Sequence, residues 1–199
     1  MTGTADLAHA GPYLVASEIV DFTHPRVAAL ADVLDAAGDA DGYGARCFAW
    51  VRDQVAHVAE CPIEVVACSA SELLAVGAGL CYAKSHLLVA LLRARGIPSG
   101  FAYQRLSLGV AGAYCLHGLA AVALGPGRWC RVDPRGGPRG ATAVYQPPAD
   151  SLVYCATDAG EYHLPEVYAE PLPHVVTALR AHASMRLLLD NLPDDRVVA

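Results

Sequence analysis

Apolar residues recur at helical spacing through the first half of the chain. Residues 26–36 and 43–57 carry Val, Leu and Phe side chains three or four positions apart, which predicts two packed amphipathic helices. Residues 57–67 show no clear period and predict an irregular connection. Ser69 followed by Glu72 forms a capping-box pattern, so we expect a short helix from there to Val76.

A more apolar helix is expected from Cys81 to about Arg95. Gly77 and Gly79 form a turn before it, and Gly96 is placed to end it. Leucines and alanines lie along one face of this segment. Its start therefore joins a glycine turn to a cysteine.

Beyond Gly96 the pattern changes to short apolar segments separated by Gly and Pro, which is typical of antiparallel strands. The tail at 173–189 is compatible with a helix that returns over the sheet. No internal repeat or linker marks a second domain, so residues 1–199 are interpreted as one α+β domain. The expected strands cover residues 97–108, 114–124, 128–132 and 141–145.

Composition narrows the class of protein. With 54% apolar and 17% charged residues among 199, the chain can bury one substantial core. A net charge near −6 without a basic cluster argues against nucleic acid as a partner. No apolar run is long enough to cross a bilayer and no signal peptide is apparent, so the sequence predicts a cytoplasmic protein that binds no membrane. Seven cysteines, an odd number, are expected to stay reduced.

Three separated residues suggest a nucleophilic site. Cys81 opens a helix, where unpaired N–H groups and the positive end of the macrodipole stabilise a thiolate relative to a thiol. His117 offers a base and Asp133 a carboxylate that orients it. The only lysine of the chain, Lys84, lies one helical turn after Cys81, where a solvated side chain is expected.

The hairpin between the strand of His117 and the strand before Asp133 decides whether these two side chains can contact each other. A three-residue loop at 125–127 would pair Leu124 with Arg128 and place Asp133 opposite Leu119. His117 is then the diagonal neighbour of Asp133 on one face, roughly 7–8 Å away at the backbone. A two-residue loop would place the two side chains on opposite faces.

These motifs resemble the transglutaminase-like superfamily, whose members share a papain-like core and a Cys-His-Asp triad. The resemblance covers about residues 69–136 and is carried by Ser-Ala-Ser-Glu-Leu-Leu, Gly-Leu-Cys-Tyr-Ala-Lys and Leu-Leu-Arg-Ala-Arg-Gly-Ile-Pro. The segments around His117 and Asp133 complete it in the same order. Many members have a His-Ala-Trp type segment, whereas this chain has His117-Gly118-Leu119.

The resemblance implies a papain-like α+β fold and acyl transfer through a thioester. Cys81 would be the nucleophile, His117 the base and Asp133 the orienting acid. The Cys81 N–H is one candidate oxyanion donor. Gln104 is a second candidate, set against its alternative as a polar residue on an exposed strand face. Tyr82 and Tyr103 are candidate pocket residues whose default explanation is packing.

Three functions remain open at this stage. The first is an acyltransferase, amidase or hydrolase that acts on a small-molecule or peptide acyl substrate. The second, also implied by the resemblance, is a Dieckmann cyclase that releases a polyketide thioester from a carrier protein. The third is an inactive papain-like scaffold.

No metal or organic cofactor is implied by any of these functions. His57, Cys61 and Cys68 give only a weak zinc signal, because no Cys-x-x-Cys pair accompanies them.

Overall fold

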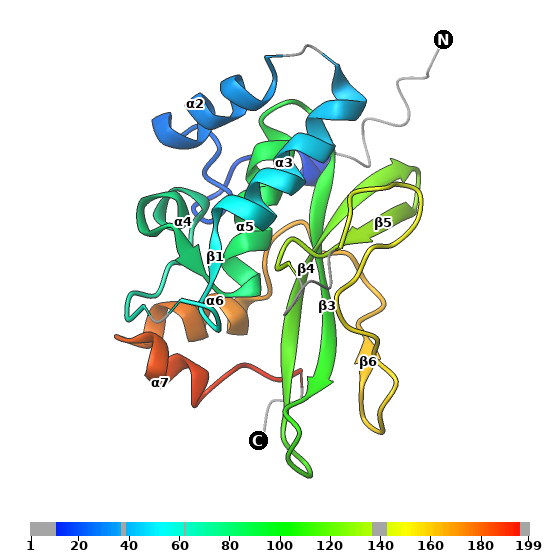
Figure 1. The fold of residues 1–199 in the computed structure, drawn as a ribbon. Coiled ribbons are helices and arrows are strands. Elements are labelled where there is room, and N and C mark those ends of the chain that lie inside the picture. Colours follow the sequence, from blue (N-terminus) through cyan, green and yellow to red (C-terminus); the bar gives the residue numbers. More distant parts are fainter. Residues whose placement is uncertain (1–10, 37–38, 62, 137–142, 196–199) are drawn as a thin grey trace.

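The computed structural model describes residues 11–36, 39–61, 63–136 and 143–195. In Figure 1 a helical layer lies beside an antiparallel sheet. The helical segments are η1 (Gly11–Tyr13), α2 (Pro25–Leu34), α3 (Ala40–Gln54), α4 (Ala70–Val76), α5 (Cys81–Arg93), α6 (Pro173–Ala181) and α7 (Met185–Leu189). The strands are β1 (Ala56–His57), β2 (Ala78–Gly79), β3 (Ser99–Ser107), β4 (Tyr114–Gly125), β5 (Arg128–Val132) and β6 (Tyr162–His163).

Helix α5 runs through the centre of the molecule. It contacts β3 and β4 on one side and α2, α3 and α4 on the other (Figure 1). All thirteen of its residues are buried. The run from Leu87 to Leu92 is apolar without a break and must be covered on all sides. The polar side chains of the helix are buried as well because each is hydrogen bonded to backbone carbonyls: Lys84, Ser85, His86 and Arg93. The predicted α+β architecture is confirmed.

The start of α5 is fixed by the elements before it. Ser69 accepts a hydrogen bond from the Glu72 N–H while the Glu72 carboxylate accepts from the Ser69 N–H, which is the predicted capping box of α4. Gly77 ends α4 in the left-handed region at φ 76°. The two residues of β2 and then Leu80 lead to Cys81, and Gly96, at φ 69°, follows the end of α5.

The prediction that the second helix reaches His57 is wrong. Helix α3 ends at Gln54, and Ala56 and His57 form β1, which pairs in parallel with β2. Val58 N–H donates to the carbonyl of Gly79 at 3.3 Å. The helical spacing of apolar residues continues to Val55, so periodicity alone gave no sign that the chain leaves the helix there.

The sheet has strand order β5-β4-β3-β6, with neighbouring strands antiparallel. Its β4–β5 hairpin turns through only two residues, Pro126 and Gly127, and not through the three that we predicted. A register shift between Ala123 and Gly125 adds one residue to β4, and Ala120 then pairs with Val132. The predicted alignment of the two strands is therefore found, because the bulge compensates for the shorter loop.

Two other expectations about the second half are wrong. The strand expected at 141–145 begins outside the described residues, and residues 143–145 are not in a strand. The outer strand next to β3 is instead β6. The tail forms two helices, and Ser184 caps the second by accepting from the Leu187 N–H. They lie on the helical side of the molecule (Figure 1), where Arg180 of α6 pairs with Glu72 of α4 at 2.6 Å.

In the described part of the chain, no helix is both long enough and apolar enough to span a membrane.

Candidate active site

Cys81 is the first residue of α5, and its side chain is almost fully buried. The residue before it, Leu80, provides no side-chain cap. The first N–H groups of a helix have no acceptor within the helix, so those of Cys81 and Tyr82 remain available at the positive end of the macrodipole. The fold thus places the sulfur of Cys81 at the positive end of a helix.

Strand β4 is bound to this helix start on both sides of His117. The Tyr82 hydroxyl donates to the Leu116 carbonyl, and the Ser85 hydroxyl donates to the Gly118 carbonyl at 3.3 Å. The Gly118 N–H in turn donates to the Sγ of Cys81 at 3.4 Å. These contacts hold the backbone around His117 against the nucleophile-bearing turn.

Gly118 allows this close approach because it has no side chain. A Cβ added at residue 118 would lie 2.8 Å from Cδ1 of Tyr82 and 3.2 Å from its Cα. The second of these contacts is to backbone, which cannot rotate away. The glycine that distinguishes this chain from the His-Ala-Trp pattern therefore has a local steric reason.

His117 and Asp133 are directly hydrogen bonded. The Nε2 of His117 lies 2.7 Å from Oδ2 of Asp133, and both side chains are buried. The register of β4 and β5 places Asp133, just after β5, near His117 as the hairpin argument predicted. With Nε2 engaged by Asp133, Nδ1 is the ring nitrogen left for another partner.

The same ring lies near Cys81, whose sulfur accepts a hydrogen bond from Gly118, the residue after His117. Burial lowers the pKa of His117, but the charge of Asp133, the charge of Cys81 and the hydrogen bond to Asp133 outweigh it and raise this pKa to about 10. Burial raises the pKa of Asp133, yet the His117 charge and hydrogen bonds bring it below its usual value. The pair therefore favours an imidazolium beside a carboxylate at neutral pH.

The segment that follows Ser151 covers this pair. Asp133 also accepts from the Arg135 N–H at 3.0 Å and the Val153 N–H at 3.3 Å. The Tyr154 ring meets the His117 ring edge to face, with centroids 5.1 Å apart. The guanidinium of Arg135 lies over the Tyr154 ring at 5.5 Å. Nothing in our sequence interpretation pointed to this segment.

The prediction that the side chain of Lys84 is solvated is wrong. This side chain is fully buried. Its ammonium donates to the carbonyls of Arg52 at 3.2 Å, Val55 at 2.6 Å and Arg135 at 3.1 Å. The charge is accepted inside the protein because three carbonyl dipoles replace its water. Lys84 thereby ties the helix of Cys81 to the segment that follows Asp133.

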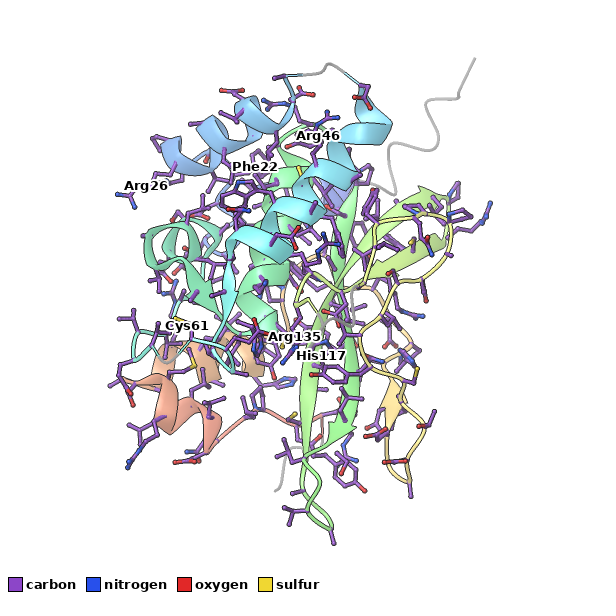
Figure 2. The ribbon with its side chains drawn as sticks, viewed as in Figure 1. Phe22, Arg26, Arg46, Cys61, His117 and Arg135 are labelled. Atoms are coloured by element: carbon purple, nitrogen blue, oxygen red, sulfur yellow. The ribbon has the colours of Figure 1, made fainter. Side chains whose placement is uncertain are left out.

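A cavity of about 320 Å³ opens at Cys81 and His117. Figure 2 shows His117 and Arg135 close together beside it, where α5 begins near β4. Its volume lies within the range of small-molecule sites. Arg135 and Glu161 contribute one charge of each sign, while much of the wall is apolar. The apolar wall includes Leu80, Leu106, Leu108, Leu116, Leu189 and Leu192.

The remaining predicted residues lie at different distances from the chemistry. Tyr82 lines the cavity. Tyr103 does not, because its buried hydroxyl accepts from the Leu172 N–H and its ring packs on Tyr168.

Gln104 is fully buried opposite His117 in the β3–β4 register, not on an exposed face. Its amide donates to the Tyr154 carbonyl at 2.9 Å, and it does not line the cavity. It supports the covering segment, and we do not retain it as an oxyanion donor.

The family comparison agrees with the motifs. A model of the transglutaminase-like superfamily matches residues 29–134, a span that includes all three proposed triad residues. No curated protein matches the chain.

Among solved structures, the chain is similar to a crystal structure of a "putative cysteine protease" from Cytophaga hutchinsonii. The two share 19% sequence identity at a TM-score of 0.49. The match covers 64% of this chain and 42% of that one, so this chain spans less than half of its neighbour's length.

Proposed function

This chain belongs to the transglutaminase-like superfamily, and we propose that it catalyses acyl transfer through a thioester on Cys81. The observation that carries the proposal is the position of one buried imidazole. His117 is hydrogen bonded to Asp133 at 2.7 Å and lines the same cavity as Cys81, whose sulfur accepts from the N–H of the next residue, Gly118. A nucleophile and a base therefore line one cavity, and the group that orients the base is hydrogen bonded to it.

The proposed reaction begins with the proton on His117 and the negative charge on Cys81. The sulfur attacks the carbonyl carbon of an acyl donor, and the electron pair of the carbonyl moves onto oxygen. When the tetrahedral intermediate collapses, the bond to the leaving group breaks and His117 gives that group its proton. An acceptor then attacks the thioester, His117 takes the acceptor's proton, and the thiolate is released.

The cavity wall favours an acyl group with an apolar chain. Leucines of β3, β4, α7 and the segment after α7 form much of its surface. Burying apolar surface against such a wall stabilises a complex by about 25 cal/mol per Å² removed from water. The acyl donor class that fits best is therefore an ester, thioester or amide with a short aliphatic chain. The C-terminal segment takes part in selection because Leu189 and Leu192 belong to the wall.

A series of N-acetylcysteamine thioesters from acetyl to octanoyl tests this proposal. Release of the thiol is expected to become faster with chain length until the cavity is full, and Cys81→Ala is expected to abolish it. Product mass spectrometry with and without an added amine separates hydrolysis from transfer. With a β-ketoacyl thioester, a cyclised product would instead identify a Dieckmann reaction. No release by the wild type and no selective labelling of Cys81 would favour the scaffold function.

A further inference from the structure

His57 is a buried histidine that the triad does not use. It lies in β1 and pairs with Gly79 of β2. Gly79 is two positions before Cys81 in the chain. Its side chain lines the same cavity as Cys81 and His117, although the residue is only 7% exposed. Its position rests on backbone pairing between β1 and β2, which makes it part of the rigid frame of the site.

The tautomer of this ring is fixed by a backbone contact. The Nδ1 of His57 accepts a hydrogen bond from the Ala59 N–H at 3.2 Å. In a neutral imidazole an accepting Nδ1 requires the proton on Nε2. Within the described residues no group accepts from Nε2, and this atom is not one of the fully buried polar atoms without a partner. Nε2–H is therefore a donor that keeps some exposure, on a residue that lines the cavity.

The surroundings also keep this ring neutral. Burial, followed by the positive charges of Arg135, Lys84 and His117, lowers the pKa of His57 to about 3, although Asp133 opposes this in part. Because the ring stays neutral, it takes up no second proton from His117 at physiological pH. It can still donate a hydrogen bond to an oxygen that gains negative charge.

We propose that His57 is a catalytic residue whose Nε2–H, together with the Cys81 N–H, stabilises the oxyanion formed on the substrate carbonyl. This inference rests on the proposed function, because an oxyanion forms only when Cys81 attacks a carbonyl carbon. It assigns to β1 the donor that Gln104 does not supply. The nearby positive charges of Arg135 and His117 add to the field that favours negative charge in this cavity.

Three substitutions separate the donor from the rest of the side chain. His57→Gln can place an amide N–H near the position of Nε2. His57→Asn can still accept from Ala59 but is too short to reach the cavity as a donor, and His57→Phe keeps a ring without any N–H. Thermal unfolding of each protein shows which variants are folded. If either His57→Asn or His57→Phe does not fold, the other still tests the loss of the donor.

Two reactions of Cys81 then give different answers. Alkylation by iodoacetamide attacks a saturated carbon and needs no oxyanion donor, whereas acylation by p-nitrophenyl acetate does. We expect Asn and Phe variants to keep the alkylation rate within about 2-fold and to lose acylation by roughly 100-fold or more, with Gln restoring at least about 10-fold of that loss.

Normal acylation in a folded Asn or Phe variant would overturn the role of His57 while leaving the thioester mechanism intact. An equal loss of alkylation and acylation would also overturn it, because the ring would then be acting on the sulfur. Failure of the wild-type enzyme to acylate Cys81 at all would instead reject the proposed function.

Discussion

The backbone N–H of Gly118 donates a hydrogen bond to the sulfur of Cys81 at 3.4 Å. The residue that follows the proposed base thus contacts the proposed nucleophile. A negatively charged sulfur accepts such a hydrogen bond more strongly than a neutral thiol does. One short stretch of β4 therefore positions both partners of the proton transfer.

Gly118→Ala is expected to impair the site because its new methyl group would contact the backbone of Tyr82. We expect a loss of about 1–3 kcal/mol in the free energy of unfolding, as for other overpacked sites. Acylation of Cys81 should fall by about 100-fold, since a displacement near 1 Å at reacting groups has effects of this size. Urea unfolding and a p-nitrophenyl acetate burst measure the two quantities.

Gly11→Ala provides the matched control for that substitution. No atom lies within 4 Å of a Cβ built at Gly11. Its unfolding free energy and acylation rate should stay at wild-type values. If both variants had the same unfolding free energy and acylation rate, the close approach at Gly118 would matter neither for stability nor for acylation.

Asp133→Asn should retain the shape of the site and lose most of the acylation rate. The amide can donate to the ring but cannot stabilise an imidazolium, so His117 no longer holds its proton in the required form. We expect a loss of several hundred-fold or more, measured under single-turnover conditions.

The same substitution made in a His117→Ala background should add little, because an absent base cannot be oriented. If the two losses multiply, the residues do not act as a unit and the role assigned to Asp133 is wrong.

The stability of the fold should depend on pH through His117. Its pKa of about 10 in the folded chain exceeds the ordinary histidine value of 6.5, so its stabilising contribution is complete below about pH 6.5 and is lost as pH rises through 10. The unfolding free energy of the wild type relative to His117→Gln should decrease by a few kcal/mol, on the order expected for this shift, between about pH 6 and pH 10. A constant or increasing difference would contradict the assigned charge pair. Asp133 acts at the other end of the scale: its lowered pKa means that its contribution is lost in acid.

Lys84→Met should destabilise the protein although both side chains are long. The substitution leaves the carbonyls of Val55, Arg52 and Arg135 without their shared donor, and we expect a cost of about 2–4 kcal/mol in urea unfolding. Arg128→Met, which removes an exposed charge, should change stability by no more than about 0.5 kcal/mol. Similar stability of the two variants would mean that the buried ammonium contributes nothing.

The sequence allowed the place of Cys81 at a helix start and the pairing of His117 with Asp133 to be predicted, because each residue lies next to a strong local signal. A glycine turn and an apolar helix mark Cys81, and the β4–β5 hairpin marks the relation of His117 to Asp133. The predicted alignment of β4 and β5 is correct although the predicted loop length is wrong. Side-chain periodicity along both strands set the register, and the bulge near Ala123 absorbed the difference.

Other features depend on contacts between distant segments and left no local pattern. Lys84 looked like a surface residue because its three carbonyl partners come from two distant segments. His57 looked like the end of a helix, since helical periodicity continues to Val55. The departure at Gly118 was visible in the sequence, but its reason required the position of Tyr82.

Acyl-enzyme mapping tests the central claim most directly. The wild-type protein is mixed with p-nitrophenyl acetate, quenched in acid within the burst phase, digested and analysed by mass spectrometry, with Cys81→Ala treated in parallel. The account predicts one acetyl group on the peptide that contains Cys81, formed well before any of the other six cysteines reacts, and no fast adduct in the variant. Acetylation spread evenly over the cysteines, or an unchanged fast adduct in Cys81→Ala, would contradict it.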